Sequence, residues 1–170
     1  MATERTPSAG LTTLVFGCDH AGWKLKQALM EHVKTNWPSI AVSDVGCFEP
    51  TRCDYPDSAR LLCDRIVDSK ATAELRPVRG VLVCGSGIGI SIAANRRRGI
   101  RCALVHDTLT ARMSRNHNDS NVIAFGERTT GEDTAKDALD AWICAGFDGG
   151  RHSGRVDKIE ENACGVQCDQ

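Results

Sequence analysis

A cysteine followed by three alternating glycines is the stretch of this 170-residue chain with the clearest capacity for chemistry. Cys84 ends an apolar run, and Gly85, Gly87 and Gly89 follow it in the sequence VLVCGSGIGISIAAN. A glycine-rich loop that leads into a helix can point its free amide groups at an anion, and the helix dipole favours negative charge there. A thiol just before a helix N-terminus favours its thiolate form, so Cys84 could act as a nucleophile or base. The pattern equally allows a cysteine that is simply buried at the end of a strand.

Position 90 separates several kinds of anion site. A dinucleotide-binding loop would carry a third glycine there and a cysteine phosphatase an arginine, whereas this chain has Ile90. A P-loop needs a lysine after its last glycine, and none follows Gly89. The sequence therefore predicts an anion-binding loop of a kind other than these three.

Two further clusters carry imidazole, amide and guanidinium groups. One contains His117, Asn118 and Arg128, and the other, GGRHSGR, contains Arg151 and Arg155. Guanidinium groups on glycine-rich loops suit a phosphate, because each offers a fork of donors and stays charged. Solvated surface arginines are the alternative, and the residues alone weigh equally for both interpretations.

Alternating apolar strands and helical segments must position these groups. This alternation predicts a parallel sheet with helices on both faces. In such a sheet ligands bind at the carboxyl ends of the strands where the strand order reverses, which is between strands 1 and 3 in the order 2-1-3-4-5. The first strand ends at Asp19 and His20 and the third at Cys84, so we expect these three side chains to meet. The five strands are expected near residues 12–18, 40–46, 79–84, 100–105 and 121–126.

The helical segments show which side chains face the core. Residues 56–69 have a buried stripe that contains Cys63, and another helix is expected to start near Ile88. Residues 131–146 repeat the pattern with Trp142 in the stripe. Three acids of this last segment fall outside the stripe, so we expect a solvated face with Asp133, Asp137 and Asp140.

Length and charge limit the organisation and the partners. A chain of 170 residues has about the size of one domain, so we expect a single domain over residues 1–170 with loosely ordered tails at about 1–11 and 164–170. The 21 basic and 22 acidic residues balance, which does not favour nucleic acid or a membrane as partner. No apolar run reaches the roughly 18 residues of a spanning helix, and the first residues do not resemble a secretory signal. We therefore expect a cytoplasmic protein.

The nine cysteines fit that location. Most lie within apolar segments, which suits reduced thiols, and Cys18 is expected to be a packing residue. Only Cys164 and Cys168 have the spacing of a candidate pair, and we interpret them as two thiols on a loose tail, because a metal site would need two more ligands. Residues 70–79, which contain the helix-breaking Pro77, are expected to form a surface excursion.

The motifs GCDHAG, DYPD, CGSGIGISIAAN, SRNHNDSNVIAFG and GGRHSGR, in this order between about residues 13 and 160, resemble the type B ribose 5-phosphate isomerases. That family also includes galactose 6-phosphate and allose 6-phosphate isomerases. The resemblance implies a Rossmann-like three-layer α/β/α sandwich with a five-stranded parallel sheet, in the order 2-1-3-4-5 or a close variant. It also implies a homodimer with shared active sites, no metal ion and no organic cofactor. Whether the dimers pair further stays open.

The same resemblance implies roles for the residues. Cys84 moves a proton between C1 and C2 of the sugar, and the loop amides from Gly85 to Gly89, with Ser86, stabilise the enediolate. His117 opens the furanose ring with help from Asp19. Some family members use a glutamate at the position of Ile90 instead of the cysteine, and this chain has no such carboxylate. The substrate-binding residues are Tyr55 beside the sugar, Asn118 at its hydroxyls, and His20, Arg128, Arg151 and Arg155 at the phosphate, with Asp54 and His152 in the same motifs.

The function implied by the resemblance is that of an aldose–ketose isomerase. It would interconvert D-ribose 5-phosphate and D-ribulose 5-phosphate in the non-oxidative branch of the pentose phosphate pathway. The alternatives are an isomerase of a 6-phosphorylated hexose, allose or galactose 6-phosphate, and a non-catalytic flavodoxin-like module that binds a phosphate-bearing ligand such as FMN. The aromatic content of 5% leaves few partners for a flavin ring.

Overall fold

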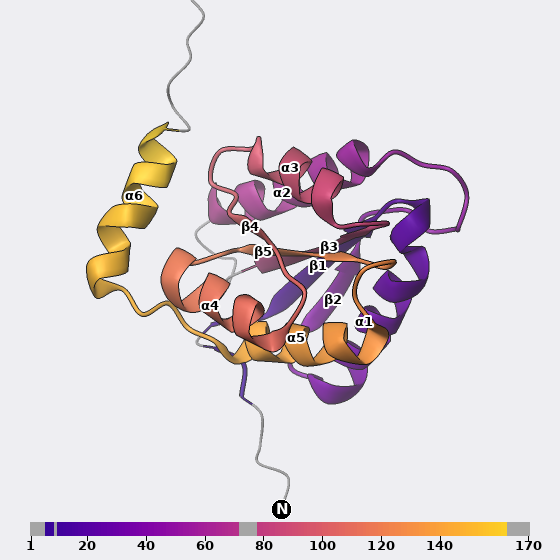
Figure 1. Ribbon diagram of the computed structural model, residues 1–170, viewed down its shortest axis with the longest axis horizontal. Helices are drawn as coiled ribbons and strands as arrows, with labels where there is room; N and C mark the ends of the chain where they lie inside the picture. Colours follow the sequence, from indigo (N-terminus) through magenta and orange to yellow (C-terminus); the bar gives the residue numbers. More distant parts are fainter. Residues whose placement is uncertain (1–5, 9, 72–77, 163–170) are drawn as a thin grey trace, which may run out of the picture.

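Five parallel strands form a single sheet in a computed structural model that describes residues 6–8, 10–71 and 78–162 (Figure 1). The strand order is β2-β1-β3-β5-β4. The expected α/β fold is therefore confirmed, in a close variant of the expected order. The strands are β1 Thr13–Cys18, β2 Ala41–Asp44, β3 Val78–Cys84, β4 Cys102–Leu104 and β5 Val122–Gly126. The helices are η1 His20–Gly22, α1 Trp23–Asn36, α2 Tyr55–Ala71, α3 Ile88–Asn95, α4 Thr108–Asn118, α5 Glu132–Cys144, η2 Gly150–His152 and α6 Ser153–Asn162.

The last two strands exchange places relative to the order 2-1-3-4-5. All five residues of β5 are buried, whereas the three residues of β4 are only half-buried. The shorter and less buried strand takes the edge, because an edge strand has a neighbour on one side only. Both segments are short apolar runs in the sequence, so their pattern did not show which of the two strands would lie at the edge. The reversal between β1 and β3, on which the expected site depends, is unaffected.

Helices cover both faces of the sheet (Figure 1). On one face α1 and α5 pack on strand residues such as Phe16 and Phe125, and on the other face α2 and α3 pack on residues such as Leu82. Cys63 of α2 lies in the second core as expected, and burial raises the pKa of its thiol to about 12. Burial likewise raises the pKa of Cys18 to about 12, which agrees with its expected role as a packing residue.

Asp140 of α5 is buried, contrary to the expectation of a solvated face, whereas Asp133 and Asp137 are exposed as expected. The Asp140 side chain accepts a hydrogen bond from Nε1 of Trp37 at 2.7 Å and pairs with Nε2 of His32 at 2.8 Å. Both partners belong to α1 or follow it directly. The expectation was wrong because the periodicity of one helix does not show which donors a neighbouring helix supplies.

A disulfide joins Cys47 and Cys53 in the loop between β2 and α2. The expectation that candidate pairing is confined to Cys164 and Cys168 was therefore wrong, and those two residues lie outside the described part of the chain. The local sequence CFEPTRC places Pro50 midway between the paired cysteines, and such a turn brings their Cα atoms to 6.6 Å. The missed signal was two cysteines flanking a turn rather than lying in an apolar segment.

The ends of the fold differ partly from the expected tails. The amide of Ser8 donates to the carbonyl oxygen of Ile143 at 2.9 Å, and Leu11 lies in the core. The chain is thus already anchored before residue 12. Most of the expected excursion at 70–79 lies outside the described residues, because the description stops at Ala71 in α2 and resumes at Val78 in β3. Within the described ranges, no helix has both the length and the apolar character needed to span a bilayer.

Lys26 of α1 is fully buried and holds the start of the disulfide loop. Its Nζ donates to the two carboxylate oxygens of Asp44 at 2.7 and 2.6 Å. It also donates to the carbonyl oxygens of Gly46 at 3.1 Å and Cys47 at 2.9 Å. A single buried ammonium group therefore ties α1, the end of β2 and the loop together.

We expect Lys26→Met to lower the free energy of unfolding by about 3–5 kcal/mol, because it leaves the charge of Asp44 without its partner in a largely buried place. Urea unfolding followed by circular dichroism measures this loss. The control is Lys24→Met on the exposed side of the same helix, which should change the free energy of unfolding by no more than about 0.5 kcal/mol. Equal stabilities of the two variants would contradict the assigned role of Lys26.

Candidate active site

The carboxyl ends of β1 and β3 lie side by side at the point where the strand order reverses. Cys18 is in register with Val83, and the amide of Asp19 donates to the carbonyl oxygen of Val83 at 3.2 Å. Cys84 is the next residue of β3. The structure thus brings the acid and the thiol to the same edge of the sheet, as the topology predicted.

Cys84 lies at the start of the glycine loop and is 4% exposed. Its Sγ accepts a hydrogen bond from the amide of Gly87 at 3.1 Å. Gly87 has φ 76°, and a Cβ there would lie 2.4 Å from Cδ1 of Leu104, so only glycine fits. A backbone donor therefore points at the sulfur just before the N-terminus of α3. This arrangement suits a thiol with a chemical role better than one that only fills the core.

Three further predicted residues lie in this loop or against it. Oγ of Ser86 accepts a hydrogen bond from the amide of Ile88 at 3.3 Å. The ring of Tyr55, at the start of α2, covers Gly89 so closely that a Cβ there would lie 2.8 Å from its Cζ. The guanidinium of Arg128 lies against Gly85, because a Cβ at that glycine would be 3.5 Å from Cζ of the arginine. Thiol, loop, phenol and guanidinium therefore form one group.

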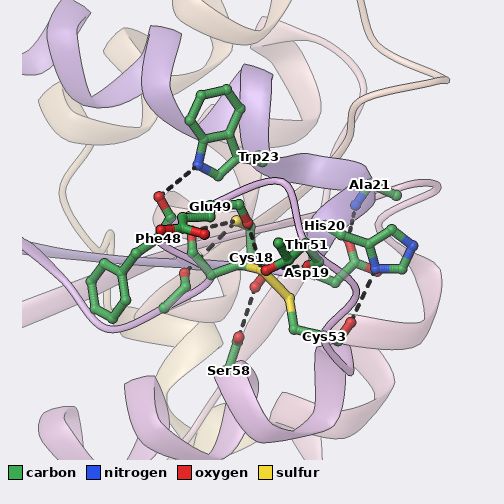
Figure 2. Close-up of a disulfide and its surroundings, with 12 residues drawn as sticks. Cys18, Asp19, His20, Ala21, Trp23, Phe48, Glu49, Thr51, Cys53 and Ser58 are labelled. Atoms are coloured by element: carbon green, nitrogen blue, oxygen red, sulfur yellow. Dashed lines mark hydrogen bonds between the residues drawn. A yellow bond between two sulfur atoms is a disulfide. The ribbon is translucent and has the colours of Figure 1, made fainter.

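Asp19 and His20 complete this first group from the end of β1. Oδ1 of the buried Asp19 accepts a hydrogen bond from the amide of Ala21 at 2.9 Å and caps η1. The exposed His20 places Nδ1 3.1 Å from the carbonyl oxygen of Cys53 (Figure 2). Because a carbonyl can only accept, Nδ1 carries the proton in this contact and Nε2 is left for a ligand.

A second group of predicted residues lies away from the carboxyl ends of the strands, toward their amino ends. α4 starts after the carboxyl end of β4 and runs back to the amino end of β5. Its 11 residues span about 16 Å. His117 and Asn118 stand at its C-terminal end, so the helix carries them away from the carboxyl ends of the strands, where Cys84 lies.

Hydrogen bonds from Asn116 bring the GGRHSGR segment to this end of α4. Its Nδ2 donates to the carbonyl oxygen of Gly146 at 2.8 Å and to Oδ1 of Asp148 at 3.2 Å. Its own carbonyl oxygen accepts from the amide of Asp148 at 2.9 Å. Gly149 and Gly150, with φ 60° and 55°, then turn the chain into η2. The loop after α5 therefore positions η2 beside His117.

His152 of η2 lies flat on His117, with ring centroids 4.2 Å apart and an interplanar angle of 8°. It is 7% exposed, and its Nε2 accepts a hydrogen bond from Nε of Arg151 at 3.3 Å. Burial lowers the pKa of His152, and the neighbouring His117, Arg151 and Arg155 lower it further, whereas Asp148 raises it. These surroundings therefore favour the neutral form of His152 against the His117 ring. Its motif indicated a site residue, but no pattern in the sequence predicted the stack.

Arg101 joins α6 to the same group. Its guanidinium pairs with Asp119 at 2.7 Å and with Glu160 of α6, and its Nε donates to the carbonyl oxygen of Asn118 at 3.1 Å. Figure 1 shows α6 standing apart from the three layers on the outer side of α4. Arg155 lies in α6 and is exposed. The second group thus consists of His117, Asn118, Arg151, His152 and Arg155.

Within one chain the two groups lie apart: the first is at the carboxyl ends of the strands, and the second lies toward their amino ends. The first holds a thiol, an acid and an anion-binding loop, and the second holds imidazoles and guanidiniums. In the part of the chain that the structure describes, no three His, Cys, Asp or Glu side chains gather as they would around a metal ion. The expectation of a cofactor-free site stays a prediction.

The sequence profile of the ribose/galactose isomerase family matches residues 14–159. The chain belongs to this family. Ribose-5-phosphate isomerase B of Escherichia coli K12 is 40% identical over 146 residues, which is 86% of this chain and 93% of that protein. Among solved structures, ribose-5-phosphate isomerase B of Clostridium thermocellum superimposes with a TM-score of 0.80 and 41% identity, covering 89% of this chain and 97% of that one.

A relative with a different substrate in its name is almost as similar. The D-erythrulose-4-phosphate isomerase of Pectobacterium atrosepticum is 36% identical over 151 residues, which is 88% of this chain and 93% of that protein. Membership of the ribose/galactose isomerase family thus agrees with the reaction type that the first group of residues suits. It does not by itself fix the length of the sugar.

Proposed function

We propose that this protein interconverts D-ribose 5-phosphate and D-ribulose 5-phosphate through an enediolate, as an enzyme of the non-oxidative branch of the pentose phosphate pathway. The observation that carries the proposal is the contact between Sγ of Cys84 and the amide of Gly87 in a glycine loop at a helix N-terminus. Relatives named ribose-5-phosphate isomerase B, at 40 and 41% identity over most of the chain, support the choice of substrate.

Cys84 is the base of this reaction. As a thiolate it takes the proton from C2 of the open-chain aldose, the electrons of that bond form the enediolate, and Cys84 then returns the proton to C1. The proton of the hydroxyl on C2 passes to the oxygen on C1 in the same sequence, so that C2 becomes the carbonyl of the ketose. The charge that develops on the enediolate oxygens falls within reach of the loop amides between Gly85 and Gly89, with Ser86 beside them. Ile90 is fully buried in the core and takes no part, which leaves Cys84 as the proton carrier.

His117 opens the furanose ring in the preceding step. It protonates the ring oxygen while a proton leaves the anomeric hydroxyl, with Asp19 as the second group for this exchange. The stack with His152 fixes the plane of the His117 ring, and a neutral His152 can hold that position without repelling a protonated His117. We assign His152 as a positioning residue that acts through His117.

Four cationic or polar side chains bind the phosphate in this proposal, and two others bind the sugar. The guanidiniums offer paired donors to phosphate oxygens, and the free Nε2 of His20 adds one more contact. Tyr55 flanks the sugar at the glycine loop, and Asn118 holds its hydroxyls. The phosphate-binding residues are His20, Arg128, Arg151 and Arg155.

A second copy of the chain completes the site, because His117 and the GGRHSGR segment lie away from Cys84 in their own chain. In a symmetric dimer the second group of one copy meets the first group of the other. Ile88 and Ile92 of α3 support this arrangement, since they are 53% and 60% exposed directly after the glycine loop. Large apolar side chains in that position suit a dimer interface. We therefore propose a homodimer with two shared active sites.

A cytoplasmic location fits the proposed pathway. Cys18, Cys63, Cys84 and Cys102 are free thiols, and a catalytic thiolate needs surroundings in which it stays reduced. We expect the Cys84 thiol of freshly isolated protein to react fully with an alkylating reagent in denaturant, where its burial in the fold no longer limits the reaction.

Direct assays of ribose 5-phosphate, allose 6-phosphate and D-erythrulose 4-phosphate test the substrate. We expect the highest kcat/KM with ribose 5-phosphate, by about tenfold or more, because a longer or shorter sugar displaces C1 and C2 from Cys84 when the phosphate is held. Each assay is repeated with Cys84→Ala, so that turnover by a contaminant is recognised. A higher kcat/KM with allose 6-phosphate or D-erythrulose 4-phosphate would overturn the assignment of the substrate but not that of the reaction.

A further inference from the structure

The Cys47–Cys53 disulfide closes a loop that joins a buried anchor on α1 to the first group of site residues. At the first end, Lys26 holds the carbonyl oxygen of Cys47 at 2.9 Å. At the second end, the carbonyl oxygen of Cys53 lies 3.1 Å from Nδ1 of His20 (Figure 2). Tyr55, which covers Gly89, follows Cys53 by two residues. The disulfide thus sets the distance between a buried anchor and two residues of the proposed substrate site.

A second contact binds the middle of the loop to α1. Nε1 of Trp23 donates to the carbonyl oxygen of Phe48 at 3.2 Å, next to the disulfide in Figure 2. Phe48 itself is exposed, and its ring lies 5.7 Å from Nζ of Lys26. The loop therefore has one firmly held end, at Cys47 and Phe48. Its other end, at Cys53, packs against the core and leads into α2, where Oγ of Ser58 donates to the carbonyl oxygen of Cys18 at 2.7 Å. The sulfur–sulfur bond adds a direct tie from this end back to Cys47.

The two cysteines of the disulfide differ in exposure. Cys53 is half-buried, whereas Cys47 is buried. A surface pocket runs along the bond, with Cys47, Cys53, Phe48 and Leu61 in its wall. The exposed side chains of Phe48 and Leu61 offer an apolar rim beside it. A small thiol that enters this pocket therefore meets Cys53 in its wall.

We propose that Cys47–Cys53 is a redox-active site at which a dithiol reductant opens the loop and thereby weakens binding of the substrate phosphate. This proposal rests on the proposed function of the neighbouring site. One thiolate of the dithiol attacks Sγ of Cys53, the Cys47–Cys53 bond breaks, and Cys47 leaves as a thiolate that takes up a proton. The second thiol of the reductant then loses its proton and displaces Cys53 from the mixed disulfide. The enzyme gains two electrons and two protons, and the reductant becomes a disulfide.

After reduction, the Cys47 thiol keeps hydrogen-bond acceptors within the loop, whereas Cys53 loses its bond to Cys47. Sγ of Cys47 lies 3.2 Å from the carbonyl oxygen of Glu49 and 3.4 Å from that of Thr51, so a thiol formed there can donate to either. Cys53 then moves independently of Cys47, and its carbonyl oxygen no longer fixes the His20 ring. Loss of one such ordering contact changes affinity by about fivefold, the effect of an ordinary hydrogen bond.

Steady-state kinetics after incubation with reduced or oxidised dithiothreitol test the inference. We expect reduction to raise KM for ribose 5-phosphate about fivefold, with little change in kcat, and to add two alkylation sites, at residues 47 and 53. The Cys47→Ser/Cys53→Ser variant should have the higher KM under both conditions. The matched control is Cys102→Ser, a strand thiol outside the loop, which should respond to the reagent as the wild type does. Because all these proteins keep Cys84, any oxidation of that thiol affects them equally.

Equal KM values in the two forms, once alkylation has shown that the bond is open, would overturn the inference. So would a redox response that persists in the double serine variant. Calorimetric titration of Cys84→Ala with inorganic phosphate separates this result from the function itself. An enzyme without turnover of ribose 5-phosphate would refute the proposed function, whereas about fivefold weaker phosphate binding after reduction would still support the redox site.

Discussion

Cys84→Ala is expected to lower kcat for ribose 5-phosphate by about 10²- to 10⁴-fold, the contribution of a well-placed general base. No other proton acceptor lies in the described glycine loop, since Ile90 points into the core and Ser86 is a hydroxyl. The variant should still bind inorganic phosphate, because the phosphate-binding residues are untouched. Its thermal midpoint should stay close to that of the wild type. The measurements are a fixed-time assay of the ribulose 5-phosphate formed and a calorimetric titration with inorganic phosphate.

Cys102→Ala is the matched control for this variant. It removes a thiol from β4, on the far side of β5 from Cys84, and burial raises the pKa of the Cys102 thiol. We expect it to keep essentially full activity. Full activity in Cys84→Ala would refute the assignment of the base, and a large loss in both variants would indicate a structural role for thiols in general.

His117→Ala is expected to lower kcat/KM for the cyclic aldose by about 10²-fold or more, the usual contribution of an acid–base group. Ribulose 5-phosphate has no furanose ring to open, so its turnover should fall far less. The two directions are therefore assayed separately, with the initial rate measured from each sugar. Equal losses in both directions would argue against a ring-opening role.

Arg112→Ala provides the control for His117→Ala, because Arg112 is an exposed residue of the same helix. It should leave both directions unchanged. His152→Phe keeps an aromatic ring on His117 but removes the neighbour that accepts from Arg151. If His152 acts by stacking alone, this variant keeps the wild-type ratio of the two directions, whereas His152→Ala shifts the ratio toward that of His117→Ala.

The sequence predicted those parts of the fold that depend on local patterns. Apolar runs placed all five strands, and the buried stripe of residues 56–69 placed Cys63 correctly because helical periodicity records which side faces the sheet. The reversal point between β1 and β3 followed from the alternation of strands and helices. It placed Asp19 and Cys84 together before any likeness to a family was used.

The features that the sequence did not predict all depend on partners far along the chain. Asp140 is buried because Trp37 and His32 reach it from another helix. β5 lies inside the sheet and β4 at its edge, because β5 is the more deeply buried of the two strands. The sequence shows two similar apolar runs and does not reveal this difference in burial. The stack of His152 on His117 depends on hydrogen bonds from Asn116 to the loop after α5. In each case the residue types were visible, but the contact that gives them their role was not.

The Cys47–Cys53 disulfide was missed for a different reason, since it does not depend on a partner far along the chain. The two cysteines are close in sequence and flank Pro50, so the local signal was present. The expectation of reduced thiols in a cytoplasmic protein outweighed it. A redox-active bond reconciles the two observations, because a disulfide that a dithiol can open is compatible with a reducing location.

A mixture of two inactive variants tests most directly whether the two groups of residues form one site across a dimer. Cys84→Ala and His117→Ala are coexpressed with different tags, and the heterodimer is isolated and assayed with cyclic ribose 5-phosphate. In the heterodimer one site carries both substitutions and the other carries neither, so we expect about half the wild-type activity per dimer. A heterodimer no more active than the two parent variants would contradict the shared site, since it would mean that Cys84 and His117 act within the same chain.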